Sequence, residues 1–266
     1  MQFDDQDLII ISDQADELAK DILHVARSSG HKAVMMNMIE ASRMFSISVS
    51  DNNIAVDPDV PIFLRVPQTP TIRESFDKAF QFGECLASIW AAAAMIKSPC
   101  INRPTPHGFT GRLSASVVIT ELRTCIAKPS NEVYSRRIPL QLDHGENEWC
   151  IQDTATGDIA ILPKRPKGQG PYKARKINRG VKYEVIVVVG ACAYRSTDAP
   201  IKHLRLEQKS VKIMKNLDLT FGTVTWYVSS DGTTASVARI NPFPSMEEVQ
   251  YVWHLAKESL MWILSI

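Results

Sequence analysis

The residues best suited to chemistry lie in a basic, glycine-containing segment in the second half of the chain. Residues 164–179 hold seven lysines and arginines and no acidic residue. Within this segment Lys164 and Lys167 stand close to Gly168 and Gly170. Ammonium groups and glycine backbone N–H groups both favour anions, so we predict that these four residues bind the phosphates of a cofactor. The same composition also suits nucleic acid or an acidic protein surface, and it is typical of an ordinary solvated loop as well.

Other reactive side chains lack the spacing that catalysis or metal binding requires. Asp143, His144 and Glu146 are close in sequence but fall in a predicted turn, and the remaining histidines are isolated from one another. Cys192 stands between two alanines in an apolar run, so we predict a core residue rather than a nucleophile. No G-x-S-x-G, Walker or Rossmann glycine pattern occurs. The sequence therefore carries none of the familiar hydrolase, P-loop or dinucleotide-binding motifs.

The elements that must position these residues begin with a β-α-β unit. Residues 8–11 (LIII) are wholly apolar, which is typical of a strand covered on both faces. Apolar residues then recur at helical spacing over residues 15–26, after the potential N-caps Ser12 and Asp13 and before a glycine stop. Residues 31–38 follow as a second strand. This order predicts a parallel sheet.

The rest of the chain is predicted to contain both helices and strands. The patterns predict, in order, a hairpin over 45–56, a strand over 61–66, helices over 71–97 and 108–126 with a short strand over 98–104 between them, short strands over 137–142, 148–152 and 158–162, a long strand over 183–194, a helix over 200–216, strands over 221–229 and 233–240 joined by an Asp-Gly turn, and a helix over 245–264. The closely spaced strands in the middle predict a small antiparallel lobe.

Composition and charge describe an ordinary globular protein. Of 266 residues 45% are hydrophobic and 22% charged, and the net charge of +1 gives no general argument for nucleic acid or membrane partners. The apolar runs are far shorter than the roughly 18 residues that span a bilayer, and the acidic first residues do not resemble a secretory signal. Five cysteines without a C-x-x-C spacing predict buried thiols in a reducing compartment. We therefore expect a cytoplasmic protein.

Two segments near the C-terminus resemble the end of ATP-grasp ligases. Residues 217–232 (LDLTFGTVTWYVSSDG) and 237–244 (VARINPFP) are similar to the RimK-like and graspetide-type peptide ligases, in which a G-L-x-F-G-A-I-D strand, an Asp-Gly turn and an L-E-V-N-P strand precede a closing helix. Further similar pieces occur in the same order as in that family, at 62–65 (IFLR), 100–104 (CINRP), 161–170 (ILPKRPKGQG) and 182–190 (KYEVIVVVG).

The resemblance implies an α/β ATP-grasp fold in three parts. These would be a pre-ATP-grasp βαβ domain over residues 1–103, a small mixed lobe over 104–180 and a C-terminal αβ lobe over 181–266. It further implies phosphate binding by Lys164, Lys167, Gly168 and Gly170, and substrate binding by Arg65. Nucleotide would lie between the last two parts.

The resemblance also implies a metal site, at which this sequence departs from the family. Mg²⁺ ions that bridge ATP phosphates need anionic oxygen ligands, and the family supplies an Asp, a Glu and an Asn. Here Thr225 replaces the Asp and Arg239 replaces the Glu, while Asn241 remains. Each charge pair at ~4 Å is worth about 4 kcal/mol at an effective dielectric constant of about 20, and between Arg239 and a dication the interaction is repulsive. Alternatively, Asn241 shapes the turn before Pro242, and Arg239 forms a salt bridge.

Two further departures agree with a damaged nucleotide site. Val185 replaces an arginine of the family's K-D-x-R strand, and the interval between Gly170 and Lys182 looks too short for the adenine-binding hinge strand.

Two hypotheses about function follow. The first is a non-catalytic binding or structural component that needs neither ATP nor Mg²⁺ and acts through a protein partner or larger assembly, which Trp262 on the last helix is placed to contact. The alternative is an active ATP-dependent carboxylate-amine ligase that uses ATP and Mg²⁺, with Glu184 or Asp218 as a substitute metal ligand.

Overall fold

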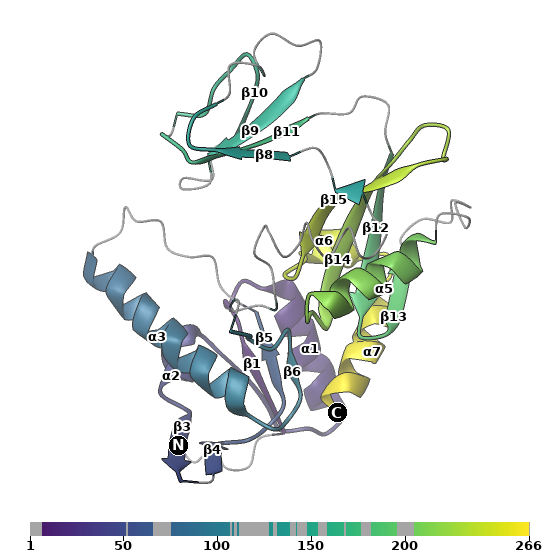
Figure 1. Cartoon of the computed structure of the whole chain (residues 1–266). Helices are drawn as coiled ribbons and strands as arrows, with labels where there is room; N and C mark the ends of the chain where they lie inside the picture. The colour runs from purple at the N-terminus through teal and green to yellow at the C-terminus, as the bar shows by residue number, and fades with distance from the viewer. Residues whose placement is uncertain are drawn as a thin grey trace.

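The described residues form three sheets and one separate hairpin. The structure, a computed structural model, describes residues 7–51, 53–65, 76–106, 108, 111, 128–129, 132–138, 142, 148–153, 159–167, 169–176, 182–195 and 205–265. Figure 1 shows the N-terminal sheet low in the molecule, the C-terminal sheet beside it and a small central sheet above both. Most of the helix predicted over 108–126 lies outside the described residues, as do Cys125, Asp143, His144, Glu146 and Gly168.

The N-terminal sheet is parallel, as its sequence predicts. Its strand order is β2-β1-β5-β6, and its elements are β1 (Leu8–Ile11), α1 (Glu17–Ser28), β2 (Ala33–Met36), α2 (Met38–Ser42), β5 (Ile62–Leu64), α3 (Phe76–Met95) and β6 (Cys100–Ile101). All four residues of β1 are completely buried, because Leu8 and Ile10 pack towards α1 while Ile9 and Ile11 pack towards α2 and α3. The prediction of a strand covered on both faces is confirmed.

The start of α1 differs from the sequence prediction. Asp16, rather than Ser12 or Asp13, is the N-cap, and its carboxylate accepts a hydrogen bond from the backbone N–H of Ala19 at 3.1 Å. Asp13 instead accepts from the backbone N–H of Ala15 in the preceding turn. The helix therefore begins later because the first acid stabilises a turn and the second stabilises the helix end.

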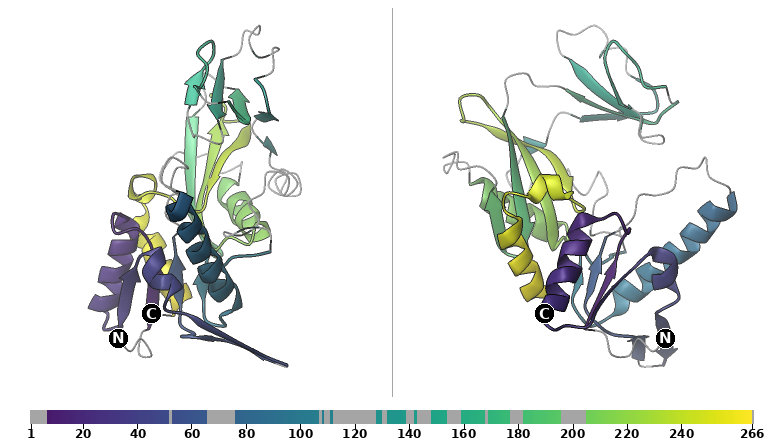
Figure 2. Two further views of the ribbon diagram at one scale, coloured as in Figure 1. Left: turned by 90° about the vertical axis from the view of Figure 1, so that its left-hand side faces the viewer. Right: turned by 180° about the vertical axis from the view of Figure 1, so that it is seen from behind.

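The predicted hairpin over 45–56 is present as β3 (Ser46–Ser50) and β4 (Asn53–Asp57). These two strands form a sheet of their own. Figure 2 shows the hairpin projecting from the lower end of the N-terminal sheet.

The central sheet is wholly antiparallel. Its order is β10-β9-β11-β8, from β8 (Glu132–Ser135), β9 (Trp149–Asp153), β10 (Ile159–Ile161) and β11 (Tyr172–Lys176). A small core of Leu142, Ile151 and Ala174 lies against one face. The strands predicted over 148–152 and 158–162 are confirmed. The first strand lies before 137–142, since Arg136 and Arg137 form a bend after Ser135.

The C-terminal sheet has the order β13-β12-β14-β15-β7. Its elements are β7 (Lys128–Pro129), β12 (Lys182–Val189), β13 (Cys192–Arg195), α5 (Leu206–Asn216), β14 (Phe221–Val228), β15 (Ala235–Asn241), α6 (Met246–Val249) and α7 (Trp253–Leu264). The strand predicted over 183–194 is wrong, because the chain turns back at Gly190, whose φ of +57° suits glycine.

The closing helix predicted over 245–264 is also interrupted. It is divided into α6 and α7 at Val252, which has φ −121° and is not helical. Valine is β-branched, which slightly lowers its preference for the helical conformation. No helix among the described residues is both long enough and apolar enough to cross a membrane.

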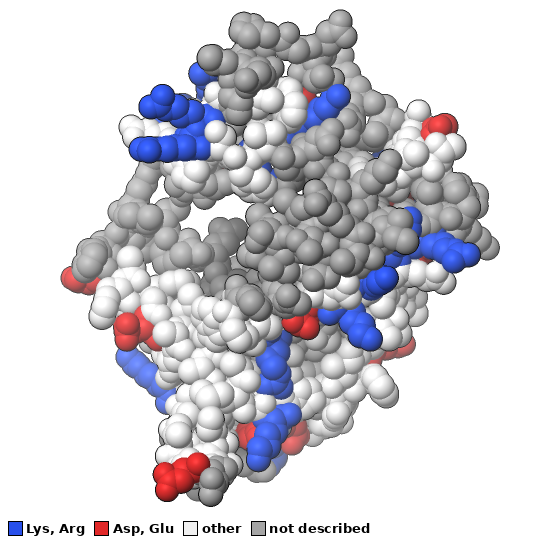
Figure 3. All heavy atoms as spheres, viewed as in Figure 1, with Lys and Arg blue, Asp and Glu red and all other residues white. Residues whose placement is uncertain are grey.

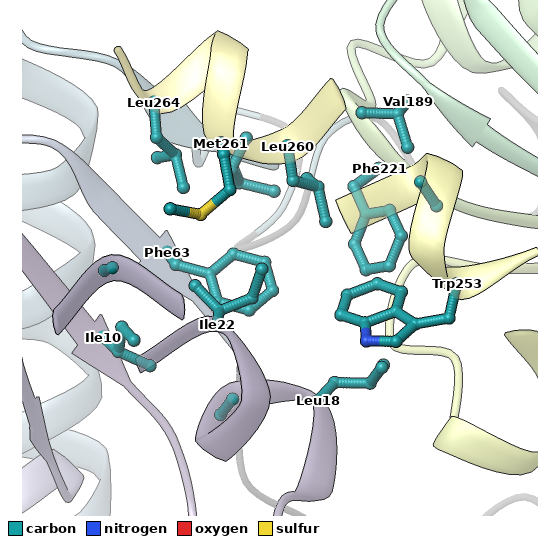
Figure 4. Packing of buried hydrophobic residues seen from close by; sticks show 14 of the residues in the cluster. Ile10, Leu18, Ile22, Phe63, Val189, Phe221, Trp253, Leu260, Met261 and Leu264 are labelled. Carbon is teal, nitrogen blue, oxygen red and sulfur yellow. The ribbon is translucent and has the colours of Figure 1, made fainter. Parts of the chain in front are cut away.

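One aromatic cluster joins the two large sheets. Figure 4 shows Phe63 of β5, Phe221 of β14 and Trp253 of α7 packed together between α1 and α7. The ring centroid of Phe221 lies 6.2 Å from that of Phe63 and 6.3 Å from that of Trp253. Because this cluster fixes β14 against the N-terminal sheet, it also fixes the position of the residues that follow Phe221 on that strand.

Candidate functional site

The strands β14 and β15 place three of the sequence-predicted residues on one face. Thr225 lies opposite Arg239, and Thr223 lies opposite Asn241, in the antiparallel register. Side chains two residues apart on a strand share a face, so Thr225, Arg239 and Asn241 belong to the face that also carries Phe221. A register shift after Thr225 ends this regular pairing.

A carboxylate that the sequence analysis missed completes this group. One carboxylate oxygen of Glu248 in α6 forms an ion pair with Arg239, with 3.4 Å between Oε1 and Nη1. Its other oxygen accepts from Asn241 Nδ2 at 2.8 Å and from the backbone N–H of Ser245 at 3.0 Å. The signal was present in the sequence, because Ser245 and Glu248 have the S-x-x-E spacing of a capping box, which the structure forms.

Asn241 is held at both ends of its side chain. While Nδ2 donates to Glu248, Oδ1 accepts from the backbone N–H of Phe243 at 3.1 Å. The amide thus stabilises the turn that leads from β15 into α6. Arg239 is 59% exposed at its side chain, so its guanidinium reaches Glu248 from the solvent side.

The substitute metal ligands do not reach this group. Glu184 lies opposite Trp226, on the other face of the sheet, where it is buried and pairs with Arg195 at 3.1 Å. Asp218 is exposed in the turn before β14. Thr225 is four residues into that strand, roughly 13 Å from its start at 3.3 Å per residue. Neither Glu184 nor Asp218 therefore lies beside Thr225.

A second group of side chains, also missed by the sequence analysis, joins the central and C-terminal sheets. Arg175 of β11 lies over the ring of Tyr227, with 5.7 Å between Cζ and the ring centroid. Tyr183 meets the same ring edge-on at 5.0 Å. Tyr227 is two residues beyond Thr225, on the same face of β14. The inner face of the central sheet thus approaches the face that carries Thr225.

The strand that supplies Arg175 corrects another sequence expectation. The interval between Gly170 and Lys182 looked too short for a hinge strand, yet β11 lies within it. β11 pairs on both sides, with β9 and β8, and is thus one of the two interior strands of the central sheet.

The first part of the basic segment, with Lys164 and Lys167, follows the edge strand of the central sheet. Lys164 and Lys167 are exposed and follow β10, which β9 separates from β11. Figure 3 shows lysine and arginine side chains standing on the central sheet at its outer surface. Gly170 has a structural role, because its φ is +82°, a Cβ there would lie 2.9 Å from the carbonyl oxygen of Arg136, and its N–H donates to buried Asp153 at 2.7 Å. Phosphate binding by Lys164, Lys167 and Gly170 stays a prediction.

Burial raises the pKa of Tyr227 to about 12, although the Arg175 guanidinium acts in the opposite direction. The folded pKa lies above the ordinary value of 10.0. Stability from this site is therefore present below about pH 10 and is lost as the pH rises towards 12. We expect an alkaline absorbance titration of the tyrosines to contain a step near 12 that Tyr227→Phe removes. Tyr251→Phe, at an exposed tyrosine, is the control and should retain that step.

Comparison with solved structures decides the fold. No family model and no curated protein matches the sequence. The ATP-grasp ligase PsnB in complex with its minimal precursor superposes with a TM-score of 0.71 at 13% identity, covering 97% of this chain and 99% of PsnB. This chain has the ATP-grasp fold.

Other ATP-grasp structures agree with this assignment. The macrocyclase MdnC from Microcystis aeruginosa MRC, bound to the precursor peptide MdnA, gives a TM-score of 0.66 at 13% identity over 97% of this chain and 99% of MdnC. A RimK-domain ATP-grasp protein from Sphaerobacter thermophilus DSM 20745 gives a TM-score of 0.58 at 13% identity. The match covers 97% of this chain and 98% of that protein. These likenesses confirm the ATP-grasp fold that the sequence resemblance implied. PsnB has also been solved with Mg and ADP.

The residues of this ATP-grasp chain do not fit a magnesium ion at Thr225. Magnesium requires several hard oxygen ligands, and this group offers one carboxylate, whose two oxygens already bind Arg239, Asn241 and Ser245. The part of the chain that the structure describes contains no group of three or more His, Cys, Asp or Glu residues that could hold a metal ion. We therefore derive no step through magnesium.

Arg65 of the ATP-grasp chain is buried beside this group. Its guanidinium forms an ion pair with Asp16, and its Nη2 donates to the carbonyl oxygen of Pro244 at 2.9 Å. The remaining nitrogen, Nη1, is buried without a hydrogen bond to the described residues. Arg65 therefore joins the end of β5 to the turn before α6. Its proposed role in substrate binding stays a prediction.

The cysteines do not all behave as expected. Cys85 and Cys100 are buried, but Cys192 is exposed at the start of β13. The expectation that Cys192 is a core residue is wrong because the chain turns at Gly190, which puts Cys192 on the edge strand of the sheet.

Proposed function

We propose that this ATP-grasp protein is a non-catalytic binding component, which does not use Mg²⁺ and ATP for ligation. The observation that carries the proposal is the ion pair between Arg239 and Glu248, opposite Thr225. By the resemblance to ATP-grasp ligases, the Arg239 guanidinium takes the place of a metal-binding acid, and it pairs with the one carboxylate of the group. Electrostatic repulsion then opposes the binding of magnesium nucleotide.

The same proposal includes a peptide or protein partner, within a larger assembly. Two proteins of the same fold, PsnB and MdnC, have been solved with precursor peptides. Tyr251, in the turn before α7, and Leu255 and Trp262 of α7 are 71%, 41% and 82% exposed and offer apolar surface. We also propose a cytoplasmic setting, which suits free cysteine thiols.

Calorimetric titration of Mg·ATP into the chain tests the proposal. We expect no magnesium-dependent binding at Mg·ATP concentrations below about 1 mM, because the positive charge of Arg239 repels Mg²⁺. The double variant Thr225→Asp, Arg239→Glu removes that charge and supplies two carboxylates. We expect it to bind Mg·ATP at least about 100-fold more tightly than the unchanged chain.

The single variant Arg239→Ala is the matched control. It removes the cation without adding a ligand, so it should gain much less affinity than the double variant. Micromolar, magnesium-dependent binding by the unchanged chain would contradict the proposal and favour an active carboxylate-amine ligase. Circular dichroism of each variant verifies that the fold is retained.

A further inference from the structure

The face of the central sheet that approaches the C-terminal sheet carries cationic and aromatic side chains. Lys173 and Arg175 occupy alternate positions of β11, and the register places Tyr134 of β8 opposite Lys173. These three residues define the inner face of the sheet. The opposite face carries the buried core residues Ile151 and Ala174. The small hydrophobic core therefore covers one side of this sheet, and the inner face is available for binding.

Aromatic side chains are exposed on and beside the inner face. Tyr134 is 49% exposed, and Tyr183, whose ring centroid lies 5.0 Å from that of Tyr227, is 58% exposed. A cation stands beside each group of rings. Lys173 Nζ lies 5.5 Å from the ring centroid of Tyr134. Arg175 Cζ lies 5.7 Å from that of Tyr227. Exposed rings that gather in one place, unlike rings scattered singly over a surface, indicate a binding site.

Exposed cations flank the inner face at both edges of the sheet. Arg136 and Arg137 follow the edge strand β8, and Lys164, Arg165 and Lys167 follow the other edge strand, β10. Figure 3 shows lysine and arginine side chains on two sides of this part of the molecule. The acid Glu132 lies opposite Arg175 in the register, but cations exceed acids among the described residues of this sheet. The excess of positive charge favours a ligand with several negative charges.

Aromatic rings beside cations have the chemistry that binds single-stranded nucleic acid, because bases stack on the rings while phosphates contact the cations. Four-stranded antiparallel sheets with exposed aromatic side chains bind RNA in this way. An acidic protein surface would pair with the cations but would not use the faces of the rings. We propose that the inner face, together with Tyr183, binds single-stranded RNA or DNA. Tyr134 and Tyr183 stack on bases, and Lys173 and Arg175 contact phosphates.

The arrangement suits several linked nucleotides rather than one. Tyr134 and Tyr183 belong to different sheets, at the two ends of a row of contacts through Lys173, Arg175 and Tyr227. A single nucleotide cannot stack on both terminal rings. A duplex does not fit this chemistry either, because its bases are already stacked on one another, whereas the bases of a single strand are free to stack on protein rings. The inference goes beyond the proposed function and does not depend on it.

Fluorescence anisotropy of labelled oligo(U) and oligo(dT), each of about twelve nucleotides, tests the proposal. The full chain is titrated into each strand in the presence of EDTA. We expect a Kd of about 10 µM at ~50 mM salt, and a slope of log K against log salt of about −1.4 or steeper, as two phosphate contacts require. Tighter binding of oligo(U) assigns the site to RNA, and tighter binding of oligo(dT) assigns it to DNA.

Variants at the inner face separate stacking from charge. Tyr134→Leu keeps an apolar side chain but removes the ring, so it should weaken binding at least about fivefold. Tyr134→Phe keeps the ring and should bind as the unchanged chain does. Arg175→Gln removes one phosphate contact, so it should reduce the magnitude of the salt slope by about 0.7. Circular dichroism verifies that each variant retains the fold.

Trp262→Leu is the matched control. Trp262 is 82% exposed near the end of α7, which Figure 1 shows at the opposite end of the molecule from the central sheet. Its loss should leave binding unchanged. The absence of binding up to about 100 µM protein, equal weakening by Trp262→Leu, equal binding of a duplex, or displacement of the strand by an equal concentration of ATP would each overturn the proposal. Because EDTA removes Mg²⁺, the result is independent of the Mg·ATP titration that tests the proposed function.

Discussion

Replacement of Asn102 with alanine is expected to lower the free energy of unfolding by about 4 kcal/mol, because it leaves several buried backbone groups without partners. The Asn102 amide is 1% exposed and lies at the junction of the N-terminal and C-terminal sheets. Its Nδ2 donates to the carbonyl oxygens of Phe221 at 2.8 Å and Pro242 at 3.0 Å. Its Oδ1 accepts from the backbone N–H groups of Thr220 and Phe221, both at 2.9 Å.

The backbone of Asn102 adds to this loss. Its φ is +55°, a conformation that asparagine tolerates better than alanine. Chemical denaturation of Asn102→Ala measures the effect. Asn37→Ala is the control, since Asn37 caps the short helix α2 at the surface and its loss should cost about 1 kcal/mol. Equal losses at the two positions would show that Asn102 does not join the sheets as described.

Replacement of Arg195 with methionine should be similarly destabilising, by about 3–5 kcal/mol. Arg195 Nε and Nη2 each lie 3.1 Å from Oε2 of Glu184, which is 2% exposed. Without the guanidinium a buried carboxylate loses its counterion on the α5 face of the sheet. The double variant Glu184→Gln, Arg195→Met removes both charges, so denaturation should show a smaller loss than the single variant Arg195→Met.

The same substitution at an exposed ion pair provides the comparison. Arg239→Met breaks the contact with Glu248, but the Arg239 side chain is 59% exposed, so the expected loss is at most about 1 kcal/mol. If Arg195→Met costs no more than Arg239→Met, the pair with Glu184 does not behave as a buried ion pair.

Sequence patterns predicted most elements because those patterns are local. The wholly apolar β1, the amphipathic α1 and the turn at Asp231 and Gly232 follow from the periods of side chains and from turn residues. The predictions failed where the chain breaks inside a segment whose hydrophobic pattern continues. Gly190 interrupts an apolar run, and the turn at Val252 interrupts an amphipathic helical pattern; in each case the pattern is the same on both sides of the break.

The features of the candidate site likewise fall into those that the sequence predicts and those that it does not. The loss of two acids at Thr225 and Arg239 is visible in the sequence, because the segments that carry them resemble the ATP-grasp strands. The ion pair with Glu248 and the contact of Arg175 with Tyr227 are not, because they depend on where α6 and β11 pack.

The sequence by itself determined the ATP-grasp architecture and the positive charge of Arg239, because side-chain periodicity and residue identity are properties of the sequence. Only the tertiary structure decided which face Glu184 occupies and which acid neutralises Arg239. Strand register assigns each side chain to one face of a sheet or the other, and a shift of one residue reverses the assignment. That assignment depends on packing between distant segments, such as the contact of Phe221 in β14 with Phe63 and Trp253.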